Sequence, residues 1–311
     1  DVCSSDLIRG EGDTLLDAVT EACEIGRDSG TRVQIAHFKA SGRNNWGKTK
    51  QSLALVEKYR EMGVEVTFDQ YPYIASSTGL ASLLPHWSHE GGASKLMEYL
   101  GDPAMREKMA ADMNIRYHWD ELLVTNAKNN PQYNGKNLQQ VAEMMEKEPL
   151  TAYFDLLEME NTQVPSVMFG MNEEDVRRVM QSPYMMVGSD GSAIAPSGIW
   201  ENNVPHPRLY GTFPRVIGYY VREGVLPLQE AVRKMTGAPA QKLGFKDRGL
   251  IKKGMKADIT IFDPEKVKDV ATFTDPQRYA AGIPYVLVNG KLVIDKNEHT
   301  GKLPGKALRK R

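Results

Sequence analysis

Short apolar runs alternate with amphipathic segments of helical period in the first seventy residues of this chain. Segment 13–29 carries its apolar side chains on one helical face, and 33–36 is a short apolar run that ends at His37. The same order repeats with the amphipathic segment 48–61 and the apolar run 64–68. Strands joined through helices form parallel β-α-β units rather than a sandwich. The sequence therefore predicts an α/β fold.

The rest of the chain interrupts this pattern and then resumes it. Residues 78–165 are less regular, and the pattern there predicts short pieces of structure: helices at 94–113, 137–146 and 150–158 and a strand at 121–125. After this insertion we expect two more strands and four more helices: strands at 167–169 and 185–187, helices at 173–181, 212–223, 227–236 and 238–243.

The character of the sequence changes near Gly249. Residues 257–262 alternate with period two, and 286–294 is apolar on both sides of Asn289-Gly290. Asn-Gly accepts the positive φ angles of a type I′ turn, so 286–294 predicts a β-hairpin. We therefore divide the chain into a main domain, 1–246, and a small β module, 247–311.

Composition excludes several classes of partner. With 39 Lys and Arg against 40 Asp and Glu, the formal net charge is −1, which gives no signal for nucleic acid. No apolar run approaches the roughly 18–20 residues that span a bilayer, so we expect no membrane partner. Two cysteines are too few for a disulfide framework and fit a reducing compartment, so we predict a cytoplasmic protein. The sequence does not indicate an oligomeric state.

The apolar run 185–187 stops abruptly at Gly188-Ser189-Asp190-Gly191. In α/β barrels, residues at the C-terminal ends of the strands carry the chemistry, so Asp190 is a candidate catalytic carboxylate. Ser-Asp-Gly is equally typical of an ordinary turn. The motif by itself leaves both interpretations open.

Other polar side chains follow the predicted strands. His37 could ligate a divalent metal or simply form a hydrogen bond at the rim of the sheet, and Lys39 would point to the same side if the strand continues. Tyr71 and Ser77 could orient a substrate or belong to a turn. Arg208, in a proline-flanked loop, could bind a carboxylate in bidentate fashion or form a structural ion pair.

Six short motifs follow one another along the chain: I-R-G-E-G at 8–12, I-A-H-F-K at 35–39, D-Q-Y-P-Y at 69–73, V-G-S-D-G at 187–191, H-P-R at 206–208 and G-T-F-P-R at 211–215. In this order they resemble the N-acyl-D-amino-acid deacylases (D-aminoacylases) of the metal-dependent amidohydrolase superfamily. The resemblance runs from about residue 8 to the end of the chain. It implies a partial TIM-like (β/α) barrel that lacks its first strands, with a small C-terminal β-sandwich module.

The resemblance also assigns roles to individual residues. It implies that His37 is a zinc ligand and that Asp190 is the catalytic aspartate. Arg208 would hold the free carboxylate of the amino acid. The remaining substrate-binding positions implied by the family are Lys39, Tyr71, Ser77 and Met171.

The chain departs from the family at its start. The family's His-x-His pair and its metal-bridging cysteine or lysine have no counterpart here, and Leu7 stands where a second zinc-ligand histidine is expected. Residues 1–7 resemble no part of the family, and neither Cys3 nor Cys23 matches its metal cysteine. We therefore expect a non-native start on an N-terminally truncated chain, with most ligands of its one or two zinc ions missing. Little or no activity is expected from these 311 residues alone.

For the full-length family member the resemblance implies hydrolysis of N-acyl-D-amino acids, small-molecule substrates, to a carboxylate and a free D-amino acid. Two rivals stay open: an amidohydrolase that acts on cyclic amides or imides, and a non-catalytic binding protein on the same fold.

Overall fold

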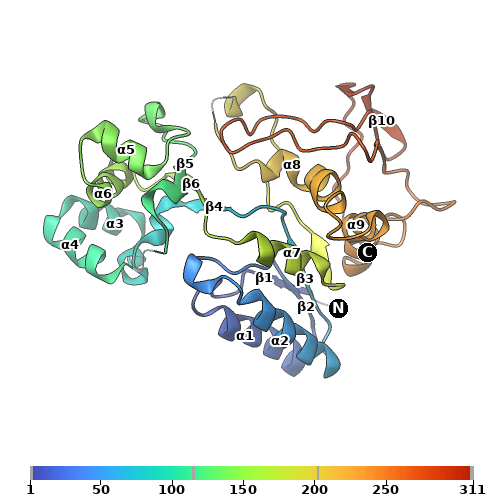
Figure 1. Ribbon diagram of the computed structural model, residues 1–311, viewed down its shortest axis with the longest axis horizontal. Coiled ribbons are helices and arrows are strands. Elements are labelled where there is room, and N and C mark those ends of the chain that lie inside the picture. The colour runs from blue at the N-terminus through green and yellow to red at the C-terminus, as the bar shows by residue number, and fades with distance from the viewer. Residues whose placement is uncertain (1–2, 114–115, 202, 309–311) are drawn as a thin grey trace.

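The computed structural model describes residues 3–113, 116–201 and 203–308, and its strands form three sheets (Figure 1). The first sheet has four strands, all parallel to their neighbours, in the order β1 (Cys3–Asp6), β2 (Arg32–Ile35), β3 (Val66–Gln70) and β7 (Met185–Val187). This confirms the predicted α/β class. Strand β1 comes from the segment 1–7 that we expected to be foreign, of which residues 1 and 2 lie outside the described part.

Three helices lie along the parallel sheet: α1 (Leu15–Ser29), α2 (Thr49–Glu61) and α7 (Glu173–Gln181). Helix α1 ends at Gly30, whose φ of 69° is a left-handed conformation that suits glycine. The apolar faces of the helices and strands share one core, in which Val19, Val56 and Phe68 are fully buried. Figure 1 shows α1 and α2 together on one side of this sheet.

The central strand β3 begins two residues later than the apolar run 64–68 predicts. It pairs with β2 on one side and with β7 on the other, and the β7 pairing extends over Asp69 and Gln70. Backbone pairing with β7 therefore continues the strand into polar sequence, which hydropathy alone does not reveal. The extension places Asp69 at the end of the sheet where β2 also ends.

The insertion forms a unit with its own core (Figure 1). Its antiparallel sheet has the order β4 (Ser76–Gly79), β6 (Pro165–Met168) and β5 (Leu122–Val124). Four helices pack with this sheet: α3 (Gly92–Gly101), α4 (Pro103–Asp112), α5 (Leu138–Met145) and α6 (Pro149–Met159). The predicted strand 167–169 thus belongs to the insertion's sheet and not to the parallel one.

Short 3₁₀ turns connect these elements. They lie at Arg43–Asn45, Leu80–Leu83, His86–His89, Trp119–Glu121, Pro131–Tyr133 and Gly198–Trp200.

The helices after β7 are α8 (Arg208–Arg215), a π-helix (Val216–Val221), α9 (Leu228–Met235) and α10 (Gly237–Lys242). Helix α8 begins four residues before the predicted start at 212. Pro214 lies inside it and offers no backbone N–H to the preceding turn, and the chain continues as a π-helix directly afterwards.

The C-terminal module contains one antiparallel sheet, in the order β11 (Glu298–His299), β10 (Lys291–Asp295), β9 (Tyr285–Val288) and β8 (Ile259–Ile261). The predicted hairpin is present, and Asn289 and Gly290 have φ angles of 48° and 76° as a type I′ turn requires. Within 247–308 the described residues supply a single layer, so they do not by themselves make a sandwich. Residues 309–311 lie outside the described part.

No helix in the described part of the chain is both long enough and apolar enough to cross a bilayer.

We predict that Gly26→Ala destabilises the protein by about 1–3 kcal/mol, although alanine is the better helix former by about 1 kcal/mol. A Cβ on Gly26 would lie 2.5 Å from Val33 Cγ2 and 2.9 Å from Val64 Cγ1, so α1 would have to move away from β2. The matched control is Gly101→Ala, whose Cβ meets nothing closer than Glu158 Oε1 at 3.8 Å. Urea unfolding measures both, and equal stability gains would contradict the packing described here.

Candidate active site at the ends of the parallel strands

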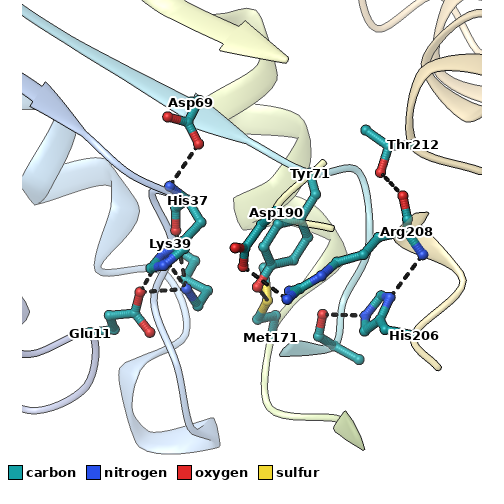
Figure 2. Close-up of polar contacts among 11 residues, drawn as sticks. Glu11, His37, Lys39, Asp69, Tyr71, Met171, Asp190, His206, Arg208 and Thr212 are labelled. Carbon is teal, nitrogen blue, oxygen red and sulfur yellow. Dashed lines mark hydrogen bonds and ion pairs between the residues drawn. The ribbon is translucent and has the colours of Figure 1, made fainter. Parts of the chain in front are cut away.

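Seven side chains meet beyond the C-terminal ends of the parallel strands (Figure 2). We call them the strand-end cluster: Glu11, His37, Lys39, Tyr71, Met171, Asp190 and Arg208. All but Glu11 are predicted site residues. Glu11 lies inside one of the six motifs, but no local pattern marked it as functional.

Asp69, at the end of β3, determines how the chain leaves β2. Its Oδ1 accepts a hydrogen bond from the backbone N–H of His37 at 2.9 Å, and its backbone oxygen accepts one from Phe38 N–H at 2.8 Å. Its Oδ2 accepts from Gln34 Nε2 at 2.8 Å. His37 has a left-handed φ of 35°, so the chain turns here and the strand does not continue.

Lys39 reaches His37 through this turn, and not through the alternation of an extended strand. Its ammonium nitrogen lies 2.8 Å from His37 Nδ1 and 3.2 Å from the His37 carbonyl oxygen, and it donates to Glu11 Oε1. Lys39 is only 4% exposed. Burial works against its charge, but the Glu11 carboxylate beside it holds the pKa of Lys39 above its usual value.

Tyr71 lies between the two cations of the cluster, as Figure 2 shows. Lys39 Nζ is 5.7 Å and Arg208 Cζ is 4.6 Å from the centre of its ring, both within the range of a cation–π contact. Its hydroxyl lies 3.9 Å from Met171 Sδ. Burial raises the pKa of this hydroxyl, so it remains a hydrogen-bond donor at neutral pH.

Asp190 and Arg208 form an ion pair of 2.9 Å between Oδ2 and Nη2. Asp190 follows β7 in a left-handed conformation (φ 46°), and its side chain remains 41% exposed. The Arg208 side chain is 7% exposed, and its Nε is buried without a hydrogen-bond partner among the described residues. A buried, unpaired guanidinium nitrogen is costly, so it marks a position suited to an anionic ligand.

His206 fixes the start of α8 and so positions Arg208. Its Nε2 lies 2.9 Å from the Ala75 carbonyl oxygen, and its Nδ1 accepts from the backbone N–H of Arg208 at 3.0 Å. Burial and the nearby Arg208 charge lower the pKa of His206 to about 3, so the ring is neutral. His206 belongs to the H-P-R motif, but no pattern in the sequence predicted a role for it.

Ser77 lies on β4, paired with Val167, and the described residues give it no hydrogen bond to the cluster. His86 and His89 share a 3₁₀ turn in the insertion. Cys23 is buried in α1, and burial raises the pKa of its thiol to about 11.

The described residues do not form a complete metal site. No group of three or more His, Cys, Asp or Glu side chains among them is arranged to hold an ion. A catalytic zinc site requires about three protein ligands. His37 fits one of them, because its ring is only 11% exposed and a carboxylate contacts its Nδ1 at 2.7 Å.

A cavity of about 440 Å³ adjoins the cluster at Glu11. Its wall includes Ser41, in the loop after β2, and His86, Arg116 and Tyr117 of the insertion. The strand-end cluster therefore borders a space large enough for a small molecule.

Comparison with known proteins agrees with the motifs. Residues 185–294 match the amidohydrolase family. The chain is 34% identical to an N-acyl-D-glutamate deacylase of Alcaligenes xylosoxydans xylosoxydans over 304 residues. It is also 34% identical to a D-aminoacylase of the same organism over 302 residues. Each match covers 97% of this chain and 53% of the relative, so the chain spans about half the length of these curated relatives.

Solved structures give the same result. One is an N-acyl-D-glutamate deacylase of Bordetella bronchiseptica in complex with zinc and a phosphonate that mimics the tetrahedral intermediate. It superimposes on this chain with a TM-score of 0.74 at 35% identity, and the match covers 93% of this chain and 52% of that one. A D-aminoacylase studied for its binuclear metal centre gives a TM-score of 0.75 at 33% identity, covering 96% and 54%. The predicted resemblance is confirmed.

We predict that His206 makes stability depend on acid pH. In the unfolded chain the ring protonates near its ordinary pKa of 6.5, whereas the folded ring does so only near 3. The unfolded state therefore binds the proton first, and folding stability falls as pH decreases through this window. Between about pH 6 and pH 4, the free energy of unfolding of the wild type should therefore fall by about 2 kcal/mol more than that of His206→Gln. Urea unfolding across that range measures it, and parallel pH profiles would contradict a neutral buried His206.

Proposed function

We propose, from the homology of this chain to the N-acyl-D-amino-acid deacylases of the amidohydrolase family, that the whole protein hydrolyses the amide bond of N-acyl-D-amino acids. Zinc would support the reaction, and the products would be a carboxylate and a free D-amino acid. The observation that carries the proposal is the buried guanidinium of Arg208, which has one nitrogen paired with Asp190 and Nε unpaired.

Arg208 would bind the α-carboxylate of the substrate. Its Nη2 already contacts Asp190, while its buried Nε has a hydrogen atom to donate. A charge-assisted hydrogen bond from Nε to the carboxylate would satisfy that donor and orient the substrate beside Asp190. Lys39 and Tyr71 would contribute a second cation and a neutral hydroxyl donor to the same pocket, with Met171 as part of its wall. A role for Ser77 in substrate binding stays a prediction.

Asp190 would act as the general base and then as the general acid. Its carboxylate is partly exposed, so a water molecule can reach it, and Arg208 holds one of its oxygens. Asp190 would take a proton from the attacking water as the new C–O bond forms. It would return that proton to the leaving nitrogen as the C–N bond breaks.

His37 would be one zinc ligand, and the described residues do not supply a full set. When bound, the metal would polarise the amide carbonyl and make the attacking water more acidic. The cavity beside Glu11 would hold the part of the substrate that extends away from Arg208.

We also propose how the chain contributes to the fold of the whole protein. The parallel sheet and its helices, within 1–246, would be part of a TIM-like barrel, and the sheet of 247–311 would be one layer of a β-sandwich. The small number of cysteines supports a cytoplasmic location.

We predict that Arg208→Met in the zinc-loaded whole protein lowers kcat/KM for N-acetyl-D-methionine by about 10- to 100-fold, the value of one hydrogen bond to a charged group. The same change should lower kcat/KM clearly less for the uncharged N-acetyl-D-methioninamide, because this analogue lacks the carboxylate and is affected only through the lost contact between Arg208 and Asp190. Arg233→Met is the control, since Arg233 is a partly exposed arginine paired with Glu230 on α9. Equal losses on both substrates would contradict carboxylate binding by Arg208.

A further inference from the structure

One carboxylate oxygen, Glu11 Oε1, contacts both His37 and Lys39. We propose that Glu11 is the positioning residue of this site. It would hold His37 in the tautomer with the proton on Nδ1, so that Nε2 presents its lone pair, and it would anchor the Lys39 ammonium beside Tyr71. The tautomer of His37 follows from the contacts of Glu11, whereas its use in binding a metal rests on the proposed function.

The positions of the protons follow from what each group can donate. Glu11 Oε1, His37 Nδ1 and Lys39 Nζ form a triangle of close contacts. An ammonium can only donate and a carboxylate can only accept, whereas a neutral imidazole nitrogen does one or the other. If Nδ1 accepted from Lys39, its lone pair would also face the carboxylate oxygen at 2.7 Å, which is repulsive.

In the other arrangement the carboxylate accepts from both donors, and the 2.8 Å approach of Lys39 Nζ to His37 Nδ1 is a contact between two donors that share this acceptor. Nδ1–H donates to Glu11 Oε1, and Lys39 donates to the same carboxylate and to the His37 carbonyl oxygen at 3.2 Å. The proton on Nδ1 then leaves Nε2 as the free acceptor of the ring. The hydrogen bond at one nitrogen of an imidazole decides in this way which nitrogen can bind a cation.

The backbone holds Glu11 in place for this task. The Glu11 carbonyl oxygen accepts from Ser41 N–H at 2.7 Å, which joins the loop before α1 to the loop after β2. Asp69 holds the His37 backbone from the opposite side through a 2.9 Å hydrogen bond. The imidazole is thus fixed both at its backbone and at Nδ1, while Lys39 and His37 hold the pKa of Glu11 below its usual value in spite of burial.

The test is the tautomer of His37 by ¹⁵N NMR of the 311-residue chain in alkaline buffer, assigned with His37→Gln. The wild type should show a protonated Nδ1 and a lone pair on Nε2. Lys39→Met should keep this pattern, because the carboxylate acceptor remains. Glu11→Ala should reverse it, because Lys39 is then the polar neighbour at 2.8 Å and can only donate to Nδ1.

His206 provides an internal control in the same spectra. Its Nε2 faces the Ala75 carbonyl oxygen and its Nδ1 accepts from Arg208 N–H, so it should carry its proton on Nε2 in every variant. A change at His37 with none at His206 separates a local loss of positioning from general unfolding.

A wild-type His37 with its proton on Nε2 would overturn the proposal, and so would reversal in Lys39→Met. Both measurements remain available if Glu11→Ala does not fold. If the whole protein hydrolyses no N-acyl-D-amino acid while the tautomers are as expected, the proposed function fails and the positioning role stands.

Discussion

The arrangement of this site depends on Asp69 at the end of the central strand. Its two carboxylate oxygens and its backbone oxygen accept hydrogen bonds from Gln34, His37 and Phe38, which joins the ends of β2 and β3. The residue after β7, Gly188, packs closely against the same side chain. A Cβ added to Gly188 would lie 3.0 Å from Asp69 Oδ1, so only glycine fits there without a shift. Parallel pairing brings three strand ends to one edge, and Asp69 fixes the turn from which His37 and Lys39 project.

Charge compensation explains why the site tolerates two buried cations. Lys39 pairs with Glu11 and Arg208 pairs with Asp190, and the Tyr71 ring lies between the two cations. Burying such groups costs several kcal/mol per ion unless partners replace the lost water. The compensation at Arg208 is incomplete, because Nε has no partner in the described part of the chain. A buried guanidinium that keeps an unpaired donor at the strand ends is better explained by ligand binding than by stability.

Periodicity predicted most helices and strands, because amphipathic faces and short apolar runs depend on local sequence. It misplaced β3, whose last residues are polar and are held by pairing with β7. The positions of His37 and Asp190 at the ends of strands could also be predicted from the sequence. Lys39, however, reaches His37 through a left-handed turn and not through strand alternation. Glu11 could not be found in this way, because its contacts cross 26 and 28 residues of sequence.

The proposed function makes this strand edge part of a deacylase of N-acyl-D-amino acids. The most direct measurement offers the zinc-loaded whole protein N-acetyl-D-methionine, its L enantiomer and a cyclic imide, with Asp190→Asn as the control for contaminating activity. We expect release of acetate and D-methionine from the first substrate alone, and loss of that release in the variant. Opening of the cyclic imide without hydrolysis of the D substrate, or hydrolysis that survives Asp190→Asn, would contradict it.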